Sequence, residues 1–411
     1  MTAATMAVGA TGATPGLERV TSWLLLAFVA SLQLSIAAAN ILLALTILCW
    51  VTLLVRERRR PAAPPFFTAL LAYAAVSLVS VLFSLNATVS LIDSKQLLLF
   101  LVVPLVYDLA RRERASTVVD VILAVGAMSA VYGIVIQYGL LQHDTLSLRV
   151  RGWMSHYMTY SGELMLVLCA AAARLIWGSR DRTWPALVVP ALVVAISLTL
   201  TRSAWVGMCA GVGLLLVMKD LRLTLLVPVA VALMYVAAPD SISHRIRSTV
   251  DITDPSNRDR LAMAQAGAGM IQDFPLTGVG PDMVGRVYPE YRPAIAVQPN
   301  NPHLHNVPLQ IAAERGLPAL AAWLVFIGVL ATGLVRVFRA AQPSRADARF
   351  GAASERTLAA AGLAAIAAML AAGMFEYNFG DSEFLMLFLV LVTLPFAAVR
   401  PADHAAATAQ R

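Results

Sequence analysis

The chain has 411 residues; 59% are apolar and only 13% are Asp, Glu, Lys or Arg, against about 25% in an ordinary soluble domain. This composition excludes a water-soluble globule, which needs a charged surface, and an intrinsically disordered chain. Three cysteines exclude a disulfide-rich secreted scaffold. The net charge of +7 is typical of the Arg-rich cytoplasmic loops of membrane proteins, and no basic surface interleaved with aromatic residues points to nucleic acid. A polytopic membrane protein remains.

The apolar runs predict about twelve membrane crossings, since one helix needs about 20 apolar residues to cross the hydrocarbon core. The first run, 20–55, carries no charge and fits two crossings broken near 35–40. Seven more precede residue 239: 65–84, 96–110, 117–140, 158–178, 184–201, 202–218 and 223–238. Three follow the polar stretch: 317–335, 357–375 and 384–399.

This pattern predicts four regions. Residues 1–238 form an N-terminal bundle of about nine helices, 239–304 a long polar loop, 305–400 the C-terminal membrane helices, and 401–411 a disordered cytoplasmic tail. Most Lys and Arg residues fall in segments that lie on one side if both termini are cytoplasmic, so the positive-inside rule places the termini there and the long loop opposite. The first residues lack the basic segment of a cleavable signal peptide.

Arg202 breaks the inside rule, because it lies at a tight outer turn between two predicted crossings. Such an arginine can extend its side chain to water at the membrane surface. Alternatively, it can grip an anion, because the guanidinium presents a planar fork of donors that matches phosphate oxygens two at a time.

The long loop contains a second pair of outer arginines, Arg258 and Arg260. They open a stretch of helical spacing that Asp254, Ser256 or Asn257 could cap and that Pro275 ends before the turn 278–280. In this stretch Leu261, Ala264, Ala268 and Ile271 would share one face. Cations are disfavoured in a first helical turn, and a bound anion would offset that cost. Pairing of both arginines with Asp254 and Asp259 is the alternative.

The third outer segment, 300–306, holds His303, His305 and Asn306, and Glu314 follows. Histidine exchanges a proton near neutral pH and is therefore the usual general base. The His-x-His spacing could instead bind a metal, although no further ligand of matching type accompanies it, or the histidines could cap a helix. Glu163, inside a crossing, and the acidic loop 376–383 have no assigned role.

Taken in order, these segments resemble the O-antigen ligase and O-antigen polymerase superfamily. The matching motifs are the Arg-small-small-Trp turn 202–205, an Arg about fifteen residues before the Pro-Leu-x-Gly-Val-Gly segment 275–280, the His-Asn pair 305–306 and the Glu-x-Gly segment 314–316. One departure is Ala264, where an aromatic residue often follows the second arginine. The ordered motifs are fairly specific for the superfamily but much less specific in distinguishing a ligase from a polymerase.

The resemblance implies an all-α membrane glycosyltransferase with a GT-C-like architecture and a partly helical periplasmic loop. It implies an inverting, metal-independent transfer of O-antigen polysaccharide from undecaprenyl diphosphate to lipid A–core in the bacterial inner membrane, with no cofactor. His305 would be the base, and Glu314 would orient His305 or an arginine. Arg202 and Arg260 would stabilise the departing diphosphate in place of a metal. Arg258, His303 and Asn306 are further substrate-binding candidates.

Three alternatives remain at this point. A polymerase of the superfamily would extend the glycan on its lipid carrier, and a protein O-oligosaccharyltransferase would use a protein hydroxyl as acceptor. A lipid or sugar transporter is less favoured, because transporter sites usually lie at the membrane midplane in broken helices. Here the midplane segments are nearly uncharged, and the outlying charges gather at one surface.

Overall fold

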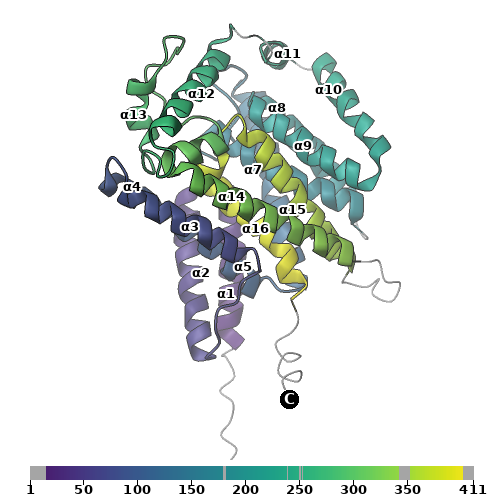
Figure 1. The fold of residues 1–411 in the computed structure, drawn as a ribbon. Helices are drawn as coiled ribbons and strands as arrows, with labels where there is room; N and C mark the ends of the chain where they lie inside the picture. Colours follow the sequence, from purple (N-terminus) through teal and green to yellow (C-terminus); the bar gives the residue numbers. More distant parts are fainter. Residues whose placement is uncertain are drawn as a thin grey trace, which may run out of the picture.

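The computed structural model describes residues 15–178, 182–237, 239–249, 251, 253–341 and 352–400, and the predicted tail 401–411 lies outside them. Over these residues the fold is a bundle of helices (Figure 1). Up to the polar stretch the helices are α1 (Pro15–Ser31), α2 (Ile36–Arg56), α3 (Phe67–Leu82), α4 (Ala87–Asp93), α5 (Val102–Leu109), α6 (Glu113–Tyr132), α7 (Tyr157–Trp177), α8 (Thr183–Leu198), α9 (Arg202–Lys219) and α10 (Leu226–Ala237). The later helices are α11 (Asp240–Arg247), α12 (Pro255–Asp273), α13 (Val284–Tyr291), α14 (Val307–Ala340), α15 (Ala352–Gly373) and α16 (Ser382–Ala398).

The helical polytopic class predicted from composition is confirmed. Seven helical segments of the described chain are long and apolar enough to cross a membrane, and α3, α8 and α16 are shorter apolar helices. The break predicted near 35–40 lies between α1 and α2, where the Ser35 side chain caps α2. The fourth span begins at Ala87, earlier than the apolar run indicated, because α4, a short 3₁₀ segment and α5 follow one another without a break. The count of twelve crossings stays a prediction.

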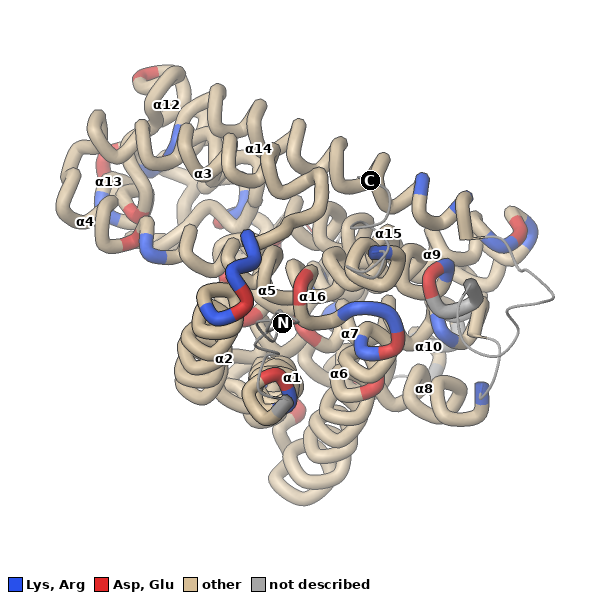
Figure 2. The backbone as a smooth tube through the Cα atoms, turned by 90° about the horizontal axis from the view of Figure 1, so that it is seen from below, with Lys and Arg blue, Asp and Glu red and all other residues tan. Residues whose placement is uncertain are grey.

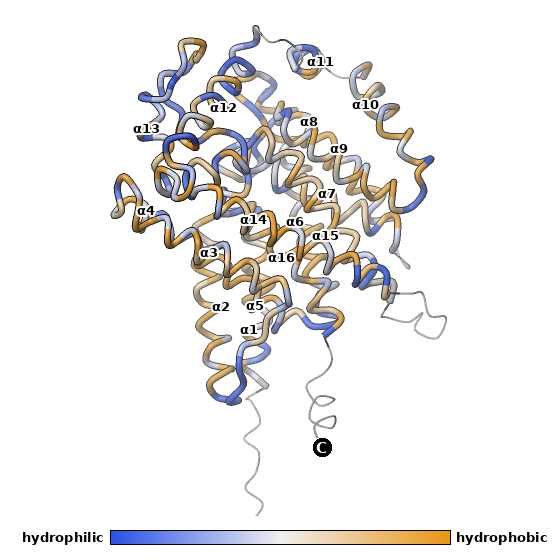
Figure 3. The backbone as a smooth tube through the Cα atoms, in the orientation of Figure 1, coloured by the Kyte–Doolittle hydropathy of each residue, from blue (hydrophilic) through white to orange (hydrophobic). Residues whose placement is uncertain are grey.

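The ends of the bundle differ in polarity. In Figure 3 hydrophobic colouring dominates the long helices, whereas hydrophilic segments gather around α11, α12 and α13. The start of α1 and the end of α16 lie at the opposite end of the bundle in Figure 1. Figure 2 views that opposite end, where Lys and Arg colour the connecting loops. The distribution agrees with the charge asymmetry from which the orientation was predicted.

Two helices form the centre of the bundle. Nearly every residue from Tyr160 to Ala173 of α7 is buried, and so is every residue of α16 from Phe384 to Ala398. A helix that is apolar all round satisfies its side chains only when other helices surround it. α15 packs along α7 and α9, and α14 packs along α3, so the outer ends of α7, α9, α14 and α15 are brought to one place.

The polar stretch folds over these outer ends with a small core of its own. Its large buried side chains include Met263, Met270, Met283 and Tyr288. Asp254 caps α12 through the backbone N–H groups of Ser256 and Asn257, as one of the three predicted caps. The face expected from the spacing is not the buried one: Leu261, Ala264 and Ala268 are exposed. The buried side of α12 instead carries Ala262, Met263, Ala266, Gly267 and Met270.

A close backbone contact fixes the loop to α14. The turn that follows Pro275 lies against a kink at Gly316, whose φ of 80° is open to glycine but costly for other residues. Val279 N–H donates to Ala313 O and Gly280 N–H to Glu314 O, both at 2.9 Å. A Cβ on Gly316 would lie 2.3 Å from Leu276 O. Two glycine-containing motifs of the sequence therefore form one structural unit.

Candidate active site

Arg202, Arg260, His305 and Asn306 line one groove of about 370 Å³ at the outer end of the bundle. They come from α9, from α12 and from the segment that precedes α14. The apolar part of the lining is Val206, Leu261, Ala264, Leu304, Leu309, Met374 and Phe375. Of these, Val206, Leu261, Met374 and Phe375 are among the exposed large apolar side chains. The groove thus combines cationic groups with an apolar wall that is open to its surroundings.

The first turn of α9 holds Arg202 in a buried position, with only 6% of the side chain exposed. Its Nη1 donates to Ser248 O at 2.9 Å, and its Nη2 donates to Ser256 Oγ at 3.1 Å. Its Nη2 also lies 3.5 Å from Asp254 Oδ1. These partners belong to the polar loop, so this arginine does not simply extend into water. Its Nε is buried without a hydrogen-bond partner among the described residues.

Arg260 lies beside Arg202, because Ser256 Oγ accepts from both side chains. Within the described residues Arg260 has no ion pair, and its Nε is buried and unpartnered. Burial and the charge of Arg202 lower the pKa of Arg260. A buried donor without a partner costs free energy, so two such donors side by side favour a bound anion.

Arg245, on α11, adds a third positive charge to this cluster. Its Nη1 lies 3.9 Å from Asp254 Oδ2, and burial followed by the charges of Arg202 and Arg149 lowers its pKa to about 10. One carboxylate, Asp254, thus faces both Arg202 and Arg245. The site has a surplus of positive charge that a diphosphate would neutralise.

His305 forms a hydrogen-bonded pair with Glu376, on the connection between α15 and α16. Nδ1 of His305 lies 2.9 Å from Oε1 of Glu376. The backbone φ of His305 is 48°, in the left-handed region that is uncommon for residues other than glycine. Burial would raise the pKa of Glu376, but hydrogen bonds from His303 and His305 hold it below its ordinary value. Glu376 therefore stays ionised and can orient the imidazole ring.

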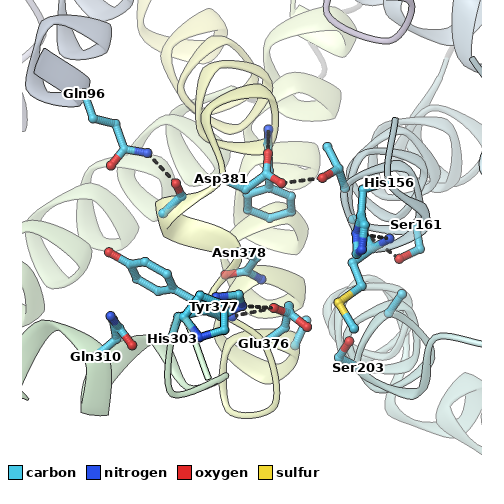
Figure 4. A pocket seen from close by; sticks show the side chains of 18 of the residues that line it. Gln96, His156, Ser161, Ser203, His303, Gln310, Glu376, Tyr377, Asn378 and Asp381 are labelled. Carbon is cyan, nitrogen blue, oxygen red and sulfur yellow. Dashed lines mark hydrogen bonds and ion pairs between the residues drawn. The ribbon is translucent and has the colours of Figure 1, made fainter. Parts of the chain in front are cut away.

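A second cavity of about 330 Å³ lies on the other side of this pair. His303 and Glu376 line it, and Ser203 lines both cavities. Most of the residues that line it are polar, and they include His156, Gln310, Asn378 and four carboxylates besides Glu376, namely Asp93, Asp282, Glu314 and Asp381. Figure 4 shows side chains from α7, α9, α14 and the α15–α16 connection around this one space. His303 lines this polar cavity and His305 lines the cationic groove, so the two adjacent rings lie between the two spaces.

The remaining predicted residues have other partners. Glu314 accepts from Gln310 Nε2 and from Asp282 N–H and pairs with Arg315, and the hydrogen bond of His305 is to Glu376 instead. Arg258 donates to Ile295 O, outside both cavities. Asn306 caps α14 and donates to Met374 O, which ties the histidine segment to the end of α15. The histidines themselves are not the cap.

The same histidine segment offers ligands of a kind that metals use. One ligand atom each from His303, His305 and Glu376 lies within 4.8 Å of the others. Two imidazoles and a carboxylate suit zinc and other transition metals. Sequence reasoning found no third ligand, because Glu376 is 71 positions from His305.

Sequence reasoning therefore missed Glu376 and Arg245. From the sequence alone, Glu376 is only one member of the acidic outer loop 376–383, to which no role is assigned. The sequence does contain a signal for Glu376. This acidic residue directly follows a predicted membrane crossing and lies, by the same prediction, on the same side of the membrane as His305, so the two side chains can meet. Arg245 breaks the positive-inside rule as Arg202 does.

Comparison with known families agrees with the motifs. A family model described as O-antigen ligase matches residues 186–324, about a third of the chain. The segment contains Arg202, Arg260, His305 and Glu314, while Glu376 lies beyond it. No curated protein matches the chain. The resemblance to the O-antigen ligase and polymerase superfamily, inferred from the ordered motifs, is confirmed over this segment.

Proposed function

We propose that this protein is an inverting, metal-independent glycosyltransferase that moves O-antigen polysaccharide from undecaprenyl diphosphate to lipid A–core. The observation that carries the proposal is the grouping of Arg202, Arg260 and His305 at one groove, with His305 hydrogen-bonded to Glu376. The protein would lie in the bacterial inner membrane with both termini in the cytoplasm. The loop 239–304, with the active site, would face the periplasm.

The groove suits a diphosphate attached to a long isoprenoid. Arg202 and Arg260 provide buried donors for phosphate oxygens, including two Nε atoms that lack partners in the described part of the chain. The exposed apolar side chains Val206, Leu261 and Phe375 would contact the lipid. Positive charge placed in advance stabilises the negative charge that develops on the diphosphate as its bond to the sugar breaks.

The base would be His305. Its Nδ1–H would donate to Glu376, which leaves the other ring nitrogen to take the proton from the attacking hydroxyl. That hydroxyl oxygen forms the new bond to the sugar carbon, and the diphosphate departs with the electron pair of the broken bond. The polar cavity lined by Gln310 and Asn378 would hold the acceptor sugar next to the pair.

In this scheme Glu314 has a structural role near the site. Its hydrogen bonds to Gln310 and to Asp282 N–H, and its ion pair with Arg315, hold the turn 278–280 against α14. Arg258 and His303 would be secondary substrate contacts.

Deletion of the gene, followed by gel analysis of lipopolysaccharide, tests the proposal. We expect loss of the O-antigen ladder together with accumulation of lipid-linked polymer, restored by the wild-type gene. Core carrying a single repeat unit would show a polymerase instead. An intact ladder with unglycosylated target proteins would show a protein O-oligosaccharyltransferase.

A further inference from the structure

His303, His305 and Glu376 form a cluster that contains one group more than a catalytic pair requires. A base and its orienting carboxylate account for His305 and Glu376. His303 adds a second imidazole, with its Nε2 at 3.4 Å from Glu376 Oε1 and its ring centroid 4.2 Å from that of His305. One ligand atom from each of the three groups thus lies within 4.8 Å of the others, at the boundary of the two cavities.

Two of the three separations between the ligand groups, those from the Glu376 carboxylate to each histidine, are close to those between zinc ligands. Zinc bonds of about 2.0–2.1 Å in a tetrahedron place neighbouring ligand atoms about 3.3 Å apart. The distances from Glu376 Oε1 to His305 Nδ1 and to His303 Nε2 are 2.9 and 3.4 Å. Oε2 of Glu376 is buried and has no hydrogen-bond partner among the described residues. Such an orphaned carboxylate oxygen is a further sign of a missing ligand.

We propose that this cluster binds one Zn²⁺ ion and that the bound ion inhibits glycan transfer. Zinc on Nδ1 of His305 would take the lone pair of that nitrogen, and the single proton of the neutral ring would move through solvent from Nδ1 to Nε2. Nε2 would then carry the proton and could no longer accept one from an acceptor hydroxyl. The ion would also bind the Glu376 carboxylate, which then no longer accepts the hydrogen bond from His305. The site would therefore be active when free of metal and blocked when zinc is bound.

The binding claim stands on the cluster alone, whereas the inhibition rests on the proposed function. We would treat the purified full-length protein with chelator and titrate Zn²⁺ against a chromophoric zinc chelator. We expect one zinc ion per chain, and affinity reduced at least about tenfold in His303→Ala and in Glu376→Gln. The matched control is His244→Ala, an exposed histidine of α11 outside the cluster, which should bind zinc as the wild type does. Absence of stoichiometric binding, or wild-type affinity in His303→Ala, would overturn the site.

Inhibition is measured separately, as the transfer rate with zinc relative to the zinc-free rate of the same variant. We expect zinc to reduce the wild-type rate, EDTA to restore it, and His303→Ala to keep a larger fraction of its own rate. Zinc binding with an undiminished transfer rate would overturn the inhibition. Absence of transfer in the zinc-free, folded wild type would overturn the proposed function and leave the binding result standing.

Discussion

Replacing Glu376 by Gln tests the catalytic pair while keeping the size of the side chain. The change removes a charged partner at 2.9 Å from His305 Nδ1. Hydrogen bonds to charged groups contribute about 1.5–3 kcal/mol. At about 1.4 kcal/mol per tenfold in rate, this predicts a fall of about 10- to 150-fold in the transfer rate. An amide that donates to Nδ1 would also favour the wrong tautomer and deepen the loss.

The assay is the initial rate of glycan transfer by purified protein in liposomes, with lipid-linked glycan and acceptor supplied. Glu290→Gln is the matched control, because Glu290 is exposed on α13, away from both cavities. Thermal unfolding of both variants reports whether the fold is intact. A Glu376→Gln rate within about twofold of the wild type, in a folded protein, would show that the charge of Glu376 does not assist His305.

The pKa of Glu376 adds a pH criterion to this experiment. Burial would raise that pKa, but the two histidines hold it below its ordinary value. The wild-type carboxylate therefore keeps its charge above about pH 4.5 and loses it only below that. The rate difference between wild type and Glu376→Gln should persist from about pH 5 to 8. Equal rates of the two proteins at about pH 8 would contradict a role for the ionised carboxylate.

Three further outcomes are expected. Arg202→Lys keeps the charge but loses the fork that donates to Ser248 and Ser256, so the transfer rate should fall about 100-fold or more; a rate near the wild type would contradict the diphosphate role. Inorganic diphosphate should raise the unfolding temperature of the wild type, and Arg260→Gln should abolish that shift; an equal shift in both would place the anion elsewhere. Gly316→Ala should destabilise the fold by at least about 2 kcal/mol, because φ is 80° and the added Cβ meets Leu276 O; unchanged unfolding would contradict the contact.

The positions of most apolar helices along the chain could be predicted from the sequence, because the length and apolarity that a membrane helix needs are local properties. The break before α2 and the cap of α12 depend on Ser35 and Asp254, whose signals are also local. The buried face of α12 was not predictable in the same way. Alanine and glycine there pack against α14 and α13, whereas Leu261 faces a groove.

The site was also predictable only in part, because it depends on packing between segments that are far apart in the sequence. The motifs identified Arg202, Arg260 and His305, and the structure places them on one groove. The partner of His305 depends on packing of the start of α14 against the end of α15, which no local pattern encodes. Hydrogen bonds from Asn306 to Met374 O and from His305 to Glu376 record that contact.

The central claim is that His305 takes the acceptor proton beside a diphosphate held by arginines. The most direct measurement is single-turnover transfer in liposomes, with the product identified by mass spectrometry, for wild type and His305→Ala. We expect glycosylated lipid A–core and released undecaprenyl diphosphate from the wild type, and no product from a folded His305→Ala protein that still binds the donor. Product formation by His305→Ala at the wild-type rate would contradict this claim.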